Sequence, residues 1–152
     1  MLKWDDIDRD GWVETPRNKT QRERRFKLWP ETLEAIEKLR ERHVLKGYED
    51  GLVFHGRQGG NYIPKGRTNH VSRRFTDLTV KAGVNRENLT FYSLRHTFQN
   101  VADEAGDFVA TSYVMGHSGN SISDRYRGTP SDERLERSTN HVRLWLFGSE
   151  AE

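Results

Sequence analysis

The stretch from Leu89 to Arg127, LTFYSLRHTFQNVADEAGDFVATSYVMGHSGNSISDRYR, contains the features around which the rest of the chain can be interpreted. Its first part has apolar residues at helical spacing: Leu94, Phe98, Val101, Ala102 and Ala105. Ser93 is a suitable N-cap and Gly106 a suitable stop, so we expect an amphipathic helix between them. Arg95 would then lie in the first turn, where free backbone N–H groups and the helix dipole favour an anion. A bound phosphate would explain an arginine there, although for Arg95 alone a solvated side chain is the simpler explanation.

A second, shorter helix is expected to follow directly. Asp107 is a favourable N-cap for it, and Gly116 is typical of the position just after a helix. His117 would lie on the turn beyond, held by the backbone yet able to reach solvent, which suits proton exchange near neutral pH. A lone histidine in such a place more often has no role. Tyr126 lies nine positions further among charged neighbours, so its hydroxyl is expected to be exposed or mobile.

The order of these residues is more informative than any one of them. Leu-Arg-His-Thr-Phe at 94–98, Gly-His-Ser at 116–118 and a tyrosine nine residues after that histidine resemble the tyrosine recombinases of the phage integrase family. In that family the arginine and the histidine bind the scissile phosphate, and the tyrosine attacks it to form a 3′-phosphotyrosyl intermediate. The resemblance implies these roles for Arg95, His117 and Tyr126.

Two further catalytic positions follow from the same resemblance. The family usually has histidine three residues before the arginine, and this chain has Tyr92 there. A phenol can donate a hydrogen bond to phosphate, but an ordinary pKa of about 10 makes it a poorer proton shuttle. The family also carries a lysine on a β-hairpin, the general acid for the leaving 5′ oxygen. Lys19, between Asn18 and Thr20, matches that position, although without the family it is one basic residue among many.

The rest of the chain predicts a mostly helical α+β domain with a small antiparallel sheet near the N-terminus. Residues 2–28 show alternating apolar positions and an Asp10-Gly11 turn signal, which predict strands around Trp4, Trp12 and Phe26. A short buried strand is expected at 52–54. Three more helices are predicted: Pro30 to His43 with Leu33, Ile36 and Leu39 buried, Asn69 to Ala82 with Val71, Phe75, Leu78 and Ala82 inward, and one starting at Thr129–Glu133 with Leu135, Val142 and Leu144 apolar.

The apolar cluster Leu144-Trp145-Leu146-Phe147 stands near the end of the sequence. It has two interpretations. The cluster could fold back on the core of its own chain, or it could dock onto a neighbouring protomer, as C-terminal segments do in the resembled family. The family resemblance also implies a tetramer on DNA for the full-length protein.

Composition places limits on the partners. A chain of 152 residues suits one domain over 1–152, and its net charge of +2 is too small to argue for nucleic acid by itself. The absence of cysteine excludes thiolate metal sites, and neither a metal nor another cofactor is expected. No membrane-spanning run is present, so we expect a soluble, cytoplasmic protein. Double-stranded DNA is the expected partner, and these basic residues are candidate contacts, although each could equally be solvated: Arg17, Arg22, Arg57, Lys65, Arg67, Arg73 and Arg74.

The resemblance starts part-way into the family's catalytic domain. Met1 to Ile7 aligns with the segment that follows the helix carrying the first catalytic arginine, so that helix and the core-binding domain are expected to be missing. Loss of one preorganised charged donor commonly costs on the order of 10²–10³ in rate. The expected function is therefore a site-specific recombinase catalytic domain, with an inactive DNA-binding remnant or topoisomerase IB-like DNA relaxation as alternatives.

Overall fold

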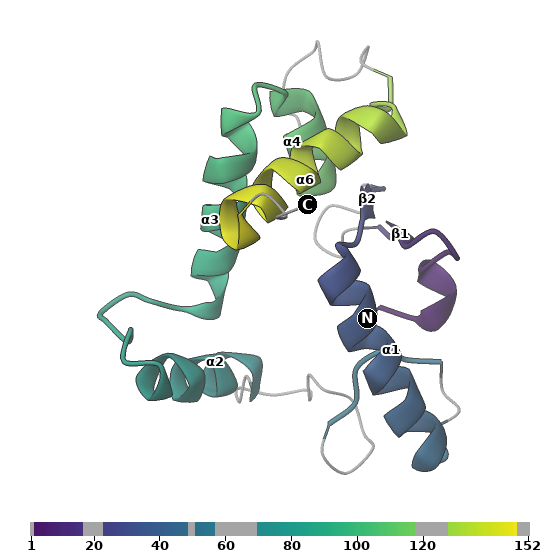
Figure 1. Ribbon diagram of the computed structural model, residues 1–152, viewed down its shortest axis with the longest axis vertical. Coiled ribbons are helices and arrows are strands. Elements are labelled where there is room, and N and C mark those ends of the chain that lie inside the picture. The colour runs from purple at the N-terminus through teal and green to yellow at the C-terminus, as the bar shows by residue number, and fades with distance from the viewer. Residues whose placement is uncertain (1, 17–22, 49–50, 57–69, 118–127, 149–152) are drawn as a thin grey trace.

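The computed structural model describes residues 2–16, 23–48, 51–56, 70–117 and 128–148. Figure 1 shows its elements in order: a 3₁₀ turn η1 (Trp4–Asp6), strands β1 (Trp12–Glu14) and β2 (Arg25–Lys27), and helices α1 (Pro30–Leu45), α2 (His70–Lys81), α3 (Phe91–Glu104), α4 (Phe108–Val114) and α6 (Asp132–Phe147). The two strands pair antiparallel, with Val13 opposite Phe26. The predicted α+β fold with a small antiparallel sheet is confirmed.

The strand expected around Trp4 is wrong, because this segment forms η1. Some backbone N–H groups of this segment donate to aspartate side chains and not to a neighbouring strand. The Asp6 carboxylate accepts from the backbone N–H of Lys3 at 2.7 Å, and the Asp8 carboxylate accepts from the N–H groups of Asp10 and Trp12. What remains of strand pairing is a pair of isolated bridges, Lys3 with Leu52 and Ile7 with Val13. The expected strand at 52–54 is likewise reduced to a bridge, although Val53 is fully buried.

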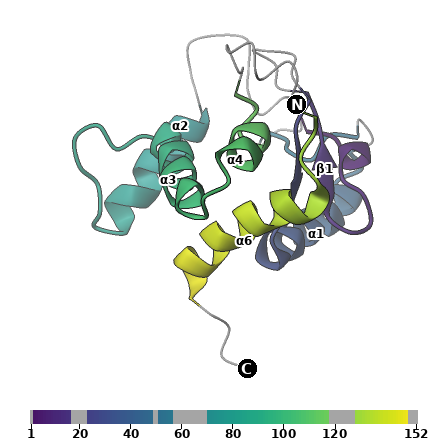
Figure 2. The same cartoon turned by 90° about the horizontal axis from the view of Figure 1, so that it is seen from above.

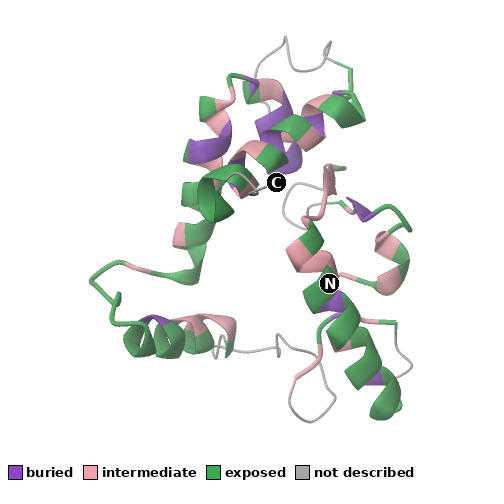
Figure 3. Ribbon diagram, in the orientation of Figure 1, coloured by how far each residue is buried: buried purple, intermediate pink, exposed green. Residues whose placement is uncertain are grey.

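The core lies where α3, α4 and α6 meet the sheet, as the buried residues in Figure 3 show. One cluster joins Trp12, Ala110, Val114 and Leu135, and a second joins Val101, Ala102 and Val142. Phe98 of α3 packs against both clusters. Figures 1 and 2 show α6 bridging the α3–α4 pair and the sheet. This packing fixes α3 and α4 relative to each other.

Helix α6 is tied to its neighbours by charge as well as by apolar packing. Arg25 of β2 forms two hydrogen bonds to the Asp132 carboxylate, at 2.8 and 2.9 Å. Arg143 forms a similar bidentate pair with Glu31 of α1. Bidentate arginine–carboxylate pairs fix geometry as well as charge. Helix α6 is thus held at both ends.

The end of α6 differs from the prediction. Leu135 and Val142 are buried as expected, but Leu144 is exposed. The side chains of Trp145, Leu146 and Phe147 are also about half exposed, so the cluster is not folded into the core. The cluster belongs to the last turn of α6. The Phe147 ring meets the Trp29 ring edge-on, with centroids 6.1 Å apart.

Helix α2 packs against α3, where the Phe75 and Phe91 rings meet edge-on. Leu78 and Ala82 were expected to face inward, and both are exposed. The residue buried in their place is Thr79, whose hydroxyl donates to the carbonyl of Thr76. Phe75, which meets α3, and the buried Thr79 lie four residues apart in one row of α2, and Leu78 lies to one side of that row. Helix α1, by contrast, buries Ile36 and half-buries Leu33 and Leu39 as predicted.

Candidate functional site

Helix α3 begins earlier than the sequence indicated. Its N-cap is Thr90 rather than Ser93, and the Thr90 backbone N–H donates to the Ser93 hydroxyl at 3.1 Å. Ser93 therefore stabilises the helix start from its third position. As a result Arg95 lies in the second turn, and the expectation that it occupies the first turn is wrong. Tyr92 occupies the first turn instead, with its side chain exposed and its ring edge-on to His96.

A backbone carbonyl at the end of α4 fixes Arg95. Its Nη2 donates to the carbonyl oxygen of Met115 at 2.7 Å, and the side chain is partly buried. Met115 is the C-cap of α4, where the partial negative charge of the last carbonyls favours a cation. A guanidinium has five N–H donors, so this bond leaves donors with which Arg95 can bind an anion.

Helix α4 and the turn after it follow the prediction. The Asp107 carboxylate accepts from the N–H of Ala110 at 3.0 Å, which confirms it as the N-cap. Gly116 has φ +61°, the left-handed conformation that ends a helix and that glycine adopts without strain. His117 follows, half-buried, and its backbone N–H donates to the carbonyl of Ser112 at 2.9 Å. Arg95 is thus bonded to the residue two positions before His117.

A groove of about 440 Å³ opens beside Arg95. Its walls are mostly apolar and come from β2, the start of α1, α3, the end of α4 and α6: Phe26, Leu28, Trp29, Thr32, Phe91, Leu94, Phe98, Val114, Met115 and Thr139. Tyr92, Arg24, Lys27 and Arg95 add polar groups. Leu94 was expected on the buried face of its helix, and that expectation is wrong, because it borders the groove with about half of its surface exposed.

The remaining predicted site residues divide into two groups. Arg73 and Arg74 lie exposed on α2. The others fall outside the described residues: Tyr126, Lys19, Arg17, Arg22, Arg57, Lys65 and Arg67. The structure therefore brings Arg95 close to the backbone of His117, and the convergence of Lys19 and Tyr126 on them stays a prediction.

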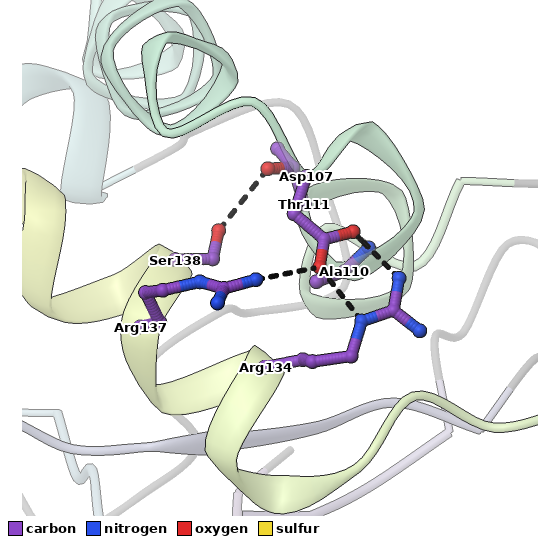
Figure 4. Close-up of polar contacts among 6 residues, drawn as sticks. All are labelled: Asp107, Ala110, Thr111, Arg134, Arg137 and Ser138. Atoms are coloured by element: carbon purple, nitrogen blue, oxygen red, sulfur yellow. Dashed lines mark hydrogen bonds and ion pairs between the residues drawn. The ribbon is translucent and has the colours of Figure 1, made fainter.

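The ion-pair network at the start of α4, shown in Figure 4, was not predicted from the sequence. Asp107 was predicted only as a cap, yet its carboxylate also accepts two hydrogen bonds from Arg134 of α6. Those bonds hold the pKa of Asp107 down to about 2, although burial acts in the opposite direction. Arg134 and Arg137 stand three residues apart on one helix face, which is the one local signal that two cations could share an acceptor.

Two further properties concern the described part of the chain as a whole. Its His, Asp and Glu side chains form no group of three or more that could hold a metal ion. None of the helices within the described ranges combines the length and the apolar character needed to cross a membrane.

Comparison with known proteins places the chain in a family. Searches of the curated proteins and of the solved structures find no significant match. The sequence model of the phage integrase family, however, matches residues 1–131, well over half of the chain. That range includes Arg95, His117 and Tyr126 in the order described above. The chain therefore belongs to the phage integrase family.

Proposed function

We propose that the chain is the catalytic domain of a site-specific recombinase, which cleaves and rejoins double-stranded DNA through a 3′-phosphotyrosyl intermediate. Family membership supports a recombinase of this kind. The observation that carries the proposal is the hydrogen bond from Arg95 to Met115, two residues before His117. The bond joins Arg95, a permanent cation, to the turn that bears His117, whose imidazole can exchange a proton near neutral pH. A cation and an imidazole together can bind a phosphodiester and stabilise its transition state.

In the proposed reaction the Tyr126 oxygen bonds to the phosphorus of the scissile phosphate as the bond from phosphorus to the 5′ oxygen breaks. The phenol releases its proton to solvent, and Lys19 delivers a proton to the departing 5′ oxygen. Arg95 and His117 stabilise the charge on the non-bridging oxygens, and Tyr92 donates a further hydrogen bond to the phosphate. One phosphate ester replaces another, so the 5′ hydroxyl of a DNA strand can reverse the step and rejoin the backbone.

DNA contacts in this proposal come from basic side chains around the site. Arg73 and Arg74 are accessible on α2, and Arg17, Arg22, Arg57, Lys65 and Arg67 complete the proposed set. Lysines and arginines that neutralise phosphates release counterions, so affinity should fall steeply as salt rises. The proposal includes a tetramer on DNA. The exposed residues Leu144, Trp145, Leu146 and Phe147 support docking of this segment onto a neighbouring protomer.

The test of the proposed function is trapping of a covalent adduct on a nicked suicide DNA substrate. The unaltered chain should form a protein–DNA adduct that survives denaturing electrophoresis, and Tyr126→Phe should abolish it. Tyr48→Phe is a matched control, because it removes a phenol hydroxyl from the far end of α1, where the Tyr48 ring stacks on His55. The control should form the adduct at the normal rate.

Three outcomes would overturn the proposal. An adduct that persists in Tyr126→Phe would exclude Tyr126 as the nucleophile. DNA binding in a gel shift without any adduct would favour a DNA-binding remnant. Relaxation of supercoiled DNA that needs no defined site would favour a topoisomerase.

A further inference from the structure

The Asp107 carboxylate is the buried centre of a polar network between α4 and α6, whose arginine side chains are partly exposed. Its Oδ2 accepts from Nε of Arg134 at 2.7 Å, and its Oδ1 accepts from Nη2 of the same arginine at 2.8 Å. Arg137 adds a longer contact from Nη2 at 3.4 Å, and Oδ1 also caps α4 through the N–H of Ala110 (Figure 4). The Asp107 side chain is 9% exposed. This is therefore a bidentate pair with a buried acceptor, which restrains geometry more than a solvated surface pair does.

A second contact ties the same two helices one turn further along. The hydroxyls of Thr111 and Ser138 lie 3.1 Å apart, and both residues are almost completely buried. Helix α6 is itself held at its ends by the pairs Arg25–Asp132 and Arg143–Glu31. The position of α4 is thus defined by contacts to a fixed element.

The far end of α4 contacts Arg95 of α3 and leads directly to His117, the two groups assigned to the phosphate. From Asp107 to Met115 the helix is short, about two turns or roughly 10 Å, and behaves as a rigid rod over that length. Met115 accepts from Arg95, and the backbone N–H of His117 donates to Ser112 within the same helix. A shift or tilt of α4 at its start would therefore displace the Met115 carbonyl from Arg95 and would move the His117 turn together with the helix.

We propose that Asp107 and Arg134 are positioning residues for Arg95 and His117. The bidentate pair holds the start of α4 on α6 and so sets the orientation of the Met115 carbonyl and of the turn that bears His117. Neither residue touches the phosphate. The inference rests on the proposed function for its effect on catalysis, whereas its effect on the site's geometry is independent of that function.

The experiment compares two isosteric substitutions. Asp107→Asn keeps an oxygen that can cap α4 but removes the charge that pairs with Arg134. Glu34→Gln, the control, also removes one carboxylate charge from an ion pair, but that pair joins Glu34 to Lys38 within α1. Each variant is assayed for the rate of adduct formation at saturating DNA and for the dissociation constant of the DNA complex. NMR follows the His117 ring and Arg95 Nε–Hε cross-peaks without DNA.

We expect Asp107→Asn to slow adduct formation by about ten- to a hundredfold, because displacement of positioned groups by about 1 Å can cost that much. The DNA dissociation constant should stay within about twofold, since the DNA-facing charges are retained. The His117 and Arg95 cross-peaks should shift. Glu34→Gln should leave the adduct rate and both cross-peaks unchanged. Arg134→Gln, which spares the cap, should repeat the Asp107→Asn result, and Arg134→Lys should restore part of the rate.

Equal effects of Asp107→Asn and Glu34→Gln on rate and spectra would overturn the positioning role, because both would then report only the loss of a carboxylate charge. Unchanged His117 and Arg95 cross-peaks in Arg134→Gln would also overturn the positioning role. This second variant keeps the test decisive if Asp107→Asn fails to fold. If the unaltered chain forms no adduct, the proposed function fails, while the NMR comparison still decides whether Asp107 and Arg134 position Arg95 and His117.

Discussion

Arg95 of α3 donates from Nη2 to the carbonyl oxygen of Met115, the residue that caps the end of α4, across 2.7 Å. A side chain on one helix is thereby fixed by the backbone of the next. This bond orients the guanidinium by a contact within the fold, which is the condition for electrostatic stabilisation without reorganisation during the proposed reaction.

Arg95→Lys should reduce the rate of covalent adduct formation by about 10²–10³, because an ammonium keeps the charge but lacks the planar fork that can bind Met115 and a phosphate together. The measurement is single-turnover trapping on the nicked substrate. Arg42→Lys, an exposed arginine-to-lysine change on α1, is the matched control and should stay within a few-fold of the unaltered rate. Adduct formation by Arg95→Lys at the normal rate would contradict a phosphate-binding role for Arg95.

Asp107 should make the stability of the domain depend on acid. Its folded-state pKa is lowered from 3.8 to about 2, chiefly by the hydrogen bonds from Arg134, so the ionised carboxylate favours the folded state. The contribution, about 2 kcal/mol, is complete above pH 4 and is lost as the pH falls from about 4 towards 2. The free energy of unfolding, measured with urea across this pH range, should depend less on pH in Asp107→Asn than in the unaltered chain.

Asp77→Asn is the control for that titration, because Asp77 lies exposed on α2. It should keep the pH profile of the unaltered chain. A profile for Asp107→Asn as steep as that of the unaltered chain would show that other carboxyl groups account for the acid sensitivity.

Local signals in the sequence predicted the helix ends with uneven success. Asp107 and Gly116 were placed correctly because a capping carboxylate and a left-handed glycine act within a few residues of the chain. The start of α3 was not, because Thr90 and Ser93 are both good caps three residues apart. The earlier start brings Phe91 into the helix and against Phe75 of α2, a contact between segments that the local pattern does not contain.

The sequence provided candidate residues for the site but not the contacts that hold them. A family motif identified Arg95 and His117, but the acceptor that fixes Arg95 is a backbone carbonyl, which every residue has and which leaves no signature in the sequence. The pairing of Asp107 with Arg134 spans 27 positions and depends on how α6 crosses α4. Periodicity likewise identified an apolar stripe that included Leu94, but the helix packing leaves Leu94 at the edge of a groove.

The buried hydroxyl pair of Thr111 and Ser138 should show strong energetic coupling. Ser138→Ala alone leaves the Thr111 hydroxyl buried without this partner, which costs about 1–3 kcal/mol of unfolding free energy. Thr111→Val combined with Ser138→Ala removes both polar groups, so the double variant should lose less than the sum of the single losses. Urea unfolding of the four proteins measures the coupling energy.

Thr97→Val is a control for that cycle, since it removes an exposed hydroxyl from α3 that donates to the carbonyl of Ser93. It should change the unfolding free energy by no more than about 0.5 kcal/mol. Additive losses for Thr111→Val and Ser138→Ala would mean that the two hydroxyls do not stabilise each other across the helix interface.

Gly11 should tolerate a side chain less well than Gly47, although both have the left-handed backbone conformation, with φ of +81° and +66°. An alanine at either position costs about 1–2 kcal/mol for that conformation. At Gly11 the added Cβ would also lie 2.7 Å from Cδ1 of Leu33, whereas at Gly47 it would meet no atom of the described residues within 4 Å. Gly11→Ala should therefore lower the unfolding free energy further than Gly47→Ala, by about 1 kcal/mol or more for the clash.

Urea unfolding measures both losses, and Leu33→Ala, which removes the clashing atoms, should bring the cost of Gly11→Ala down to that of Gly47→Ala. Equal losses in the presence of Leu33 would show that Leu33 rotates away freely and does not hold this turn against α1.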